Sequence, residues 1–204
     1  MGKRALFGSL YAAIVVAVFG KFTFLAPWLL LFFTVFLVHE CIQLLSKSGL
    51  HKTLILWIIL PMGLAVKQSL EVPELLLFVF VSIWSSDTFA YLVGRAIGKT
   101  PLAPTISPNK TVEGALGGIV FTLLIGWGYA RFFPVPEVSA RELILYSGLV
   151  AIFAPLGDLL ASWVKRRAKV KDSGVFLPGH GGAIDRLDSF LTASFAVLLL
   201  TYFI

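Results

Sequence analysis

Long apolar stretches, separated by short polar segments, make up most of the chain. Seven stretches are almost entirely apolar, at roughly 5–20, 23–38, 53–68, 73–93, 114–133, 142–161 and 188–204. About 20 residues of α-helix, each rising 1.5 Å, span the roughly 30 Å hydrocarbon core of a bilayer. The pattern therefore predicts an all-α fold, a polytopic integral membrane helix bundle with about seven transmembrane helices.

The composition narrows the class of protein further. Of the 204 residues, 58% are hydrophobic and 14% are charged, whereas a soluble domain usually has about 45–50% apolar and 25% charged residues. A soluble globular enzyme and a disordered chain are thereby excluded. No internal repeat or long linker divides the sequence, so residues 1–204 are expected to form a single transmembrane domain.

The distribution of basic residues predicts the orientation in the membrane. With the N-terminus in the cytoplasm, 13 of the 17 Lys and Arg residues lie in segments on the cytoplasmic side, as the positive-inside rule requires. The loops 94–113 and 162–187 then share that face. The net charge of +6 indicates contact with anionic membrane lipids, and no nucleic-acid partner is expected.

Two acidic residues, Asp87 and Asp158, fall inside apolar spans. An ionised side chain at the centre of a membrane helix costs at least about 2.5–3.5 kcal/mol, so such residues usually face a polar cavity or a partner. We therefore expect both to be functional. The alternative is that each lies near the cytoplasmic end of its helix and simply reaches water.

The segment from Ser162 to Asp188 mixes acidic, basic and glycine residues between two spans. If it is helical at its end, Asp185 and Asp188 share one helix face, and Mg²⁺ is typically bound by one or two carboxylates together with substrate phosphates. Gly181 and Gly182 would let backbone N–H groups face an anion. The basic residues that can neutralise phosphates are Lys165, Arg166, Lys171 and Arg186. An ordinary lipid-binding basic loop would not explain the acids or the glycines.

A second polar segment, 107–114, is predicted to form a turn that leads into the fifth apolar span. Its hydroxyl, amide and ammonium groups, together with free helix N–H groups, suit a nucleotide or phosphate. The residues concerned are Ser107, Asn109, Lys110, Thr111 and Glu113. The alternative is helix capping by Asn109 or Thr111, which is compatible with binding.

Both segments resemble those of a known family, the phosphatidate cytidylyltransferases, or CDP-diacylglycerol synthases. The signature positions of that family are matched at the same spacing by Ser162, Lys165, Arg166, Lys171, Asp172, His180, Gly181, Gly182, Asp185, Arg186 and Asp188. The stretch from Asp87 to Gly114 resembles its second conserved region, although Asn109 stands where many members have lysine. The resemblance covers about residues 85–190.

The resemblance implies transfer of a cytidylyl group from CTP to phosphatidate, giving CDP-diacylglycerol and pyrophosphate for phospholipid biosynthesis. It implies a centre containing Mg²⁺, with a second cation, K⁺ or Mg²⁺, left open, and Asp158, Asp185 and Asp188 as metal ligands. Lys171, Asp172 and Arg186 would complete the catalytic set. The substrate-binding set would comprise Asp87, Ser107, Asn109, Lys110, Thr111, Glu113, Ser162, Lys165, Arg166, His180, Gly181 and Gly182.

The expected setting is the inner (plasma) membrane of the cell, with the active site facing the cytoplasm, and the resemblance implies a homodimer. Three alternatives remain open at this point. The chain could be a related CTP-using enzyme that acts on another lipid phosphate or a polyprenol. It could also be a transporter, with Asp87 and Asp158 lining an ion path, or a scaffold without activity.

Overall fold

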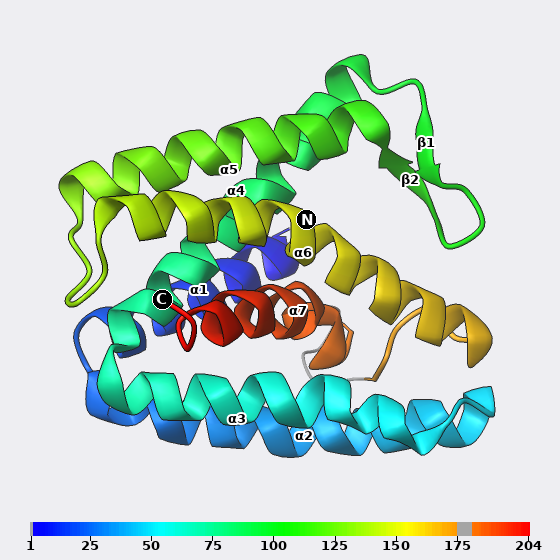
Figure 1. Ribbon diagram of the computed structural model, residues 1–204. Helices are drawn as coiled ribbons and strands as arrows, with labels where there is room; N and C mark the ends of the chain where they lie inside the picture. Colours follow the sequence, from blue (N-terminus) through cyan, green and yellow to red (C-terminus); the bar gives the residue numbers. More distant parts are fainter. Residues whose placement is uncertain (1, 175–180) are drawn as a thin grey trace.

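The computed structural model describes residues 2–174 and 181–204, and within this part the chain is an all-α bundle with one small hairpin (Figure 1). The α-helices are α1 (Gly2–Gly20), α2 (Ala26–Ser48), α3 (Leu56–Glu71), α4 (Pro73–Ile97), α5 (Val112–Phe132), α6 (Ala140–Arg167) and α7 (Ile184–Leu200). Short 3₁₀ turns precede α2 and α3, at η1 (Thr23–Leu25) and η2 (Lys52–Ile55). Every predicted apolar span corresponds to one helix, so the predicted fold class is confirmed.

Five of the described helical segments are long and apolar enough to cross a membrane: Thr23–Ser48, Lys52–Glu71, Pro73–Ile97, Val112–Phe132 and Ala140–Arg167. The protein is therefore an integral membrane protein. The helices at the two ends of the chain are different. Helix α7 has 17 residues, and the described apolar part of α1, Gly8–Gly20, is also short. Seven crossings stay a prediction.

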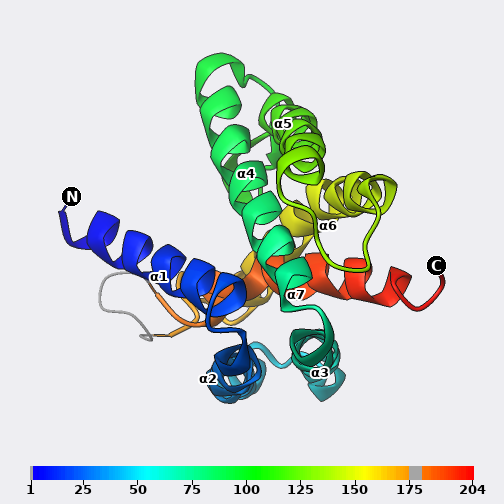
Figure 2. The same cartoon turned by 90° about the vertical axis from the view of Figure 1, so that its left-hand side faces the viewer.

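Helix α7 lies at the centre of the bundle. It packs against α6 along its length and also contacts α2, α3 and α4. Figure 2 shows the pair α2 and α3 on one side of α7 and the pair α4 and α5 on the other. Phe80 of α4 stacks on Phe190 of α7 with ring centroids 4.4 Å apart, and Phe89 stacks on Phe121 of α5 at 4.0 Å. These two stacked pairs hold α4 against both α7 and α5.

Several helices extend further than the apolar pattern predicted. Helix α6 continues to Arg167, so Ser162, Lys165 and Arg166 lie on a helix and not in the expected loop 162–187. The basic residues of its last turn complement the negative end of the helix dipole. Helix α4 likewise continues to Ile97. Hydropathy marks the part of a helix that lies in hydrocarbon, whereas hydrogen bonding continues into the polar region.

The segment expected as a polar turn, 107–114, instead begins with a strand, β2 (Ser107–Thr111), which forms an antiparallel hairpin with β1 (Pro101–Ala103) just before it. Pro101 pairs with Thr111, and Ala103 pairs with Ser107. The hairpin projects at the end of the bundle toward which the C-terminal part of α6 also runs (Figure 1). The correction matters for function, because Asn109 and Lys110 lie on a strand that faces α6.

Helices α4 and α5 approach each other closely where the hairpin begins and ends. A methyl group on Gly114 would lie 2.6 Å from the carbonyl oxygen of Ala90 and 3.1 Å from the Cα of Gly94. These neighbours are backbone atoms that cannot rotate away. The close approach therefore requires glycine at position 114.

We expect Gly114→Ala to destabilise the protein by about 1–3 kcal/mol, because the added methyl overpacks the contact between α4 and α5. Thermal unfolding of the detergent-purified protein would measure the loss. Gly128→Ala is the matched control on the same helix, since a methyl there has no neighbour within 4 Å. Equal unfolding temperatures for the two variants would contradict the tight contact.

Candidate active site

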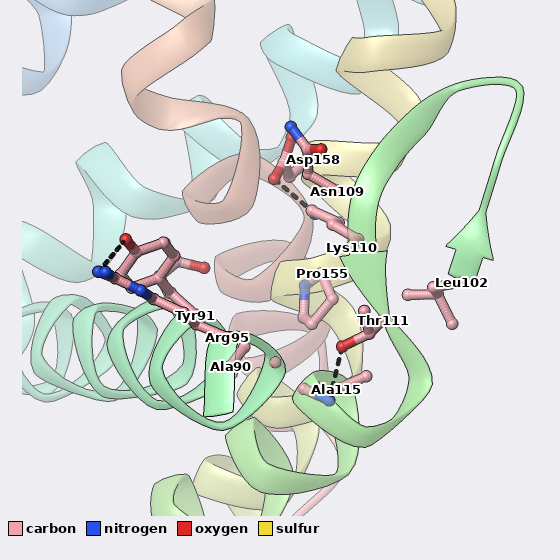
Figure 3. A pocket seen from close by; sticks show the side chains of 13 residues that line it. Ala90, Tyr91, Arg95, Leu102, Asn109, Lys110, Thr111, Ala115, Pro155 and Asp158 are labelled. Carbon is pink, nitrogen blue, oxygen red and sulfur yellow. Dashed lines mark hydrogen bonds and ion pairs between the residues drawn. The ribbon is translucent and has the colours of Figure 1, made fainter. Parts of the chain in front are cut away.

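A cavity of about 440 Å³ lies between α4, the hairpin, the start of α5 and α6 (Figure 3). It brings together the two acids inside apolar spans, Asp87 and Asp158, and residues of the 107–114 segment, whereas no residue of the segment from Ser162 to Asp188 lines it. Its walls are formed by Asp87, Ala90, Tyr91, Gly94, Arg95, Leu102, Asn109, Lys110, Thr111, Gly114, Ala115, Pro155 and Asp158. Five of the predicted site residues thus share one cavity, namely Asp87, Asn109, Lys110, Thr111 and Asp158.

An ion pair connects the hairpin to α6 across this cavity. The Nζ of Lys110 lies 2.5 Å from the Oδ2 of Asp158 (Figure 3). One helical turn further, the hydroxyl of Ser162 donates to the Oδ1 of Asp158 at 3.3 Å. Both side chains of the pair are about a third exposed, at 27% and 33%. Solvent therefore reaches the pair, and a charged ligand could compete for either partner.

Asp87 of α4 and Asp188 of α7 lie close enough to Asp158 for their charges to interact. Asp188 is 8% exposed and accepts the backbone N–H of Ser189 at 2.7 Å. Asp87 and Asp158 line the cavity, whereas Asp188 is buried and does not. In the part of the chain that the structure describes, however, no three acidic, His or Cys side chains already stand together at metal-ligand spacing.

Asp185, the second residue of α7, accepts hydrogen bonds from three separate donor groups. Its Oδ1 accepts Lys165 Nζ at 2.5 Å. Its Oδ2 accepts the N–H of Gly182 at 2.9 Å and the N–H of Ser173 at 2.8 Å, and the oxygen of the Ser173 hydroxyl lies 3.0 Å away. The side chains of Asp185 and Lys165 are only 9% and 11% exposed. Asp185 therefore ties α6, the segment after α6 and α7 together.

Two residues predicted to bind substrate support the hairpin. Glu113 accepts the backbone N–H groups of Lys99 and Thr100, at 3.1 and 3.2 Å, and the Thr100 hydroxyl at 2.9 Å. Thr111 caps α5, because its hydroxyl oxygen accepts the N–H of Gly114 at 3.1 Å. The capping alternative is thus confirmed for Thr111, which also lines the cavity.

The remaining predicted residues lie outside the cavity wall. Ser107 pairs within the hairpin, and Lys171 and Asp172 are exposed in the segment after α6. Arg166 is exposed and donates to the carbonyl oxygen of Val170 at 3.2 Å, and Arg186 is exposed at the start of α7. Gly181 has a φ of +81°, which favours glycine. His180 lies outside the described residues.

The sequence did not single out two residues that contact Asp185 or its surroundings, Ser173 and Glu40. Ser173 is 6% exposed and Glu40 is 5% exposed. Glu40 carried a usable signal, since it is an acid only two residues beyond the end of a predicted apolar span. It was overlooked because the predicted span ended at residue 38, whereas α2 continues to Ser48.

Comparison with known proteins is consistent with this geometry. The model of the cytidylyltransferase family matches residues 66–204. The phosphatidate cytidylyltransferase of Bacillus subtilis (strain 168) is 48% identical over 116 residues, which are 56% of this chain and 42% of the relative. The phosphatidate cytidylyltransferase of Haemophilus influenzae (strain ATCC 51907 / DSM 11121 / KW20 / Rd) is 43% identical over 132 residues, 63% of this chain and 45% of the relative. The chain thus spans about half the length of the curated relatives it matches.

We expect Lys165→Met to destabilise the protein by about 3–5 kcal/mol, because it would leave the Asp185 carboxylate buried without its cation. Thermal unfolding in detergent would measure the loss. Lys169→Met is the matched control, as Lys169 is exposed just after the end of α6. If both variants unfold at the wild-type temperature, the ion pair does not hold α7 to α6.

Proposed function

The chain belongs to the cytidylyltransferase family, and we propose that it transfers the cytidylyl group of CTP to phosphatidate, giving CDP-diacylglycerol and pyrophosphate. The curated relatives that it matches are named phosphatidate cytidylyltransferases. The single observation that carries the proposal is the shared cavity, in which Lys110 of the hairpin meets Asp158 of α6. A lysine and acidic residues in one cavity suit a nucleoside triphosphate, because the lysine can bind its phosphates and the acids can bind its counter-ion.

The nucleotide phosphates would contact the cationic side of this cavity. Lys110 and Arg95 line it, and Asn109 and Thr111 add an amide and a hydroxyl. Arg95 is already oriented, since its Nη1 donates to the Tyr91 hydroxyl at 3.3 Å (Figure 3). The exposed bases outside the cavity would receive the lipid phosphate and the leaving pyrophosphate. These are Arg166, Lys171 and Arg186.

The acids beside the cavity fit Mg²⁺ in their chemistry, because Mg²⁺ prefers carboxylate and phosphate oxygens. Asp158 and Asp188, with Asp87 beside them, would hold it, and their mutual repulsion favours a bound cation. Asp185 is the other member of the predicted ligand set. Its Oδ2 accepts the N–H groups of Ser173 and Gly182, whereas its Oδ1 accepts only Lys165, so Oδ1 keeps one lone pair for a metal ion. When bound, Mg²⁺ would neutralise charge on the nucleotide phosphates and the leaving group.

The reaction needs no nucleophilic side chain, because a phosphatidate oxygen is already an anionic nucleophile. That oxygen would attack the α-phosphorus of CTP while the bond from the α-phosphorus to the bridging oxygen of the β-phosphate breaks. Pyrophosphate then leaves with the electron pair. The protein would act by positioning two anions and by stabilising the charge that develops. Lys110 would serve this role by exchanging Asp158 for phosphate.

The setting follows from the same proposal. The site would face the cytoplasm from the inner (plasma) membrane, which is supported by the basic residues of the segments assigned to that side, and phosphatidate would arrive from the surrounding membrane lipids. A homodimer and a second cation, K⁺ or Mg²⁺, belong to the proposal as features of the family resemblance.

The purified protein should release pyrophosphate only when CTP, phosphatidate and a divalent cation are all present. The measurement is coupled pyrophosphate detection in detergent micelles, with phosphatidate, an isoprenoid-ether lipid phosphate and polyprenol supplied in turn. Pyrophosphate release with the isoprenoid-ether lipid phosphate alone would replace phosphatidate as the acceptor, and release of CDP with polyprenol, measured separately, would indicate a polyprenol kinase. Full activity after exhaustive chelation would remove the cation from the proposal, and ion flux in proteoliposomes without CTP would indicate a transporter.

Asp158→Asn should lower kcat by about 100-fold or more, the usual loss when one charge-stabilising group is removed from an active site. The variant keeps the shape of the side chain, so the protein should still fold. Glu137→Gln is the matched control, because Glu137 lies in the connection between α5 and α6 at the far end of both helices. Near-normal turnover by Asp158→Asn would exclude its proposed role.

A further inference from the structure

Glu40 of α2 is a buried carboxylate that the proposed mechanism does not use. It is 5% exposed, and it precedes the part of the chain that matches the cytidylyltransferase family. A buried carboxylate is costly unless hydrogen-bond donors or cations compensate it. Its partners therefore indicate why an acid is present at this position.

The partners of Glu40 are donors from the other end of the sequence. Its Oε1 accepts the N–H of Ala183 at 2.8 Å, and its Oε2 accepts the N–H of Ile184 at 3.0 Å. These two N–H groups lie at the start of α7, where a helix favours negative charge. The Oε2 also accepts the hydroxyl of Ser173 at 2.7 Å. Glu40 thus caps α7 from a separate helix.

The chain passes close to this carboxylate at two glycines, and a larger residue at either would have to displace the Glu40 side chain. A methyl on Gly174 would lie 2.6 Å from the Oε1 of Glu40. A methyl on Gly182 would collide with both carboxylate oxygens and with the hydroxyl of Ser173. Glu40 therefore fixes the chain on both sides, just after Ser173 and just before α7.

Ser173 connects Glu40 to Asp185. Its hydroxyl lies 2.7 Å from the Oε2 of Glu40 and 3.0 Å from the Oδ2 of Asp185, and its N–H donates to the same Oδ2 at 2.8 Å. Asp185 in turn accepts Lys165 of α6. A continuous set of hydrogen bonds therefore runs from α2 through Ser173 to the acid and the lysine at the start of α7.

We infer that Glu40 is a positioning residue for the cytidylyl-transfer site. It fixes the start of α7 and Ser173, and through them it sets the placement of Asp185 and Lys165. The inference rests on the proposed function for its catalytic consequence. The positioning itself can be tested without activity.

The first test is hydrogen–deuterium exchange of the full-length protein in detergent, comparing wild type with Glu40→Gln. The amide keeps the size of the side chain but loses one acceptor and the charge. Exchange at Ser173 and at residues 182–184 should become about tenfold faster, because local opening becomes easier, while α5 stays unchanged. Gln43→Ala, an exposed change on the same helix, should have no effect. Unchanged exchange in Glu40→Gln would overturn the inference.

The second test separates positioning from stability by kinetics. Glu40→Gln should lower kcat by about tenfold or more, as small misplacements of catalytic groups do, with the KM for CTP nearly unchanged because Glu40 does not line the nucleotide cavity. Combining it with Ser173→Ala should add little, since both act through Asp185. A normal kcat in Glu40→Gln, or fully additive losses, would contradict the inference.

Two further outcomes have a clear meaning. If Glu40→Gln does not fold, Ser173→Ala takes its place, and it should lower kcat while the N–H groups of Ala183 and Ile184 stay protected. Normal kcat in that variant would count against the inference. If the wild-type protein releases no pyrophosphate from CTP, the proposed function fails, and the exchange experiment still decides whether Glu40 holds the start of α7.

Discussion

Carboxylates inside an apolar bundle need donors or cations, and this need connects the segments of the protein. Asp158 pairs with Lys110 on the hairpin, and Asp185 pairs with Lys165 on α6. Glu40 accepts hydrogen bonds from the first N–H groups of α7. Each partner comes from a distant part of the sequence. Because a buried carboxylate without a partner costs several kcal/mol, the same contacts that satisfy the acids also hold the helix ends together.

The acidic residues differ in how many hydrogen-bond donors surround their carboxylates. Glu40 and Asp185 are surrounded by donors, and both are held by backbone N–H groups that cannot move away. Asp158 is partly exposed and depends on one flexible lysine and one hydroxyl. Asp87 and Asp188 add negative charge beside it. This contrast separates a rigid group that supports α7 from a responsive group that can exchange its partners for a ligand.

The sequence predicted the helices well, because long apolar runs in a membrane have few alternatives to helix. It could not predict where those helices end, since hydropathy reports the hydrocarbon region and not the hydrogen bonding beyond it. That limit placed Ser162 and Lys165 in a loop and left Glu40 without a role. The hairpin was missed because its two short strands carry no apolar alternation. The pairing of Lys110 with Asp158 depends on tertiary packing, which neither segment reveals alone.

The matched family region begins at residue 66, yet the start of α7 depends on α2. Without Glu40, the N–H groups of Ala183 and Ile184 would lack these acceptors. Gly174 and Gly182 both lie against the Glu40 carboxylate, so their close packing also depends on this residue. The tight glycines and the buried acid therefore belong to one arrangement, formed by parts of the chain that lie more than 130 residues apart. The N-terminal helices are in this sense part of the site, because the acid at the start of α7 is held in place from α2.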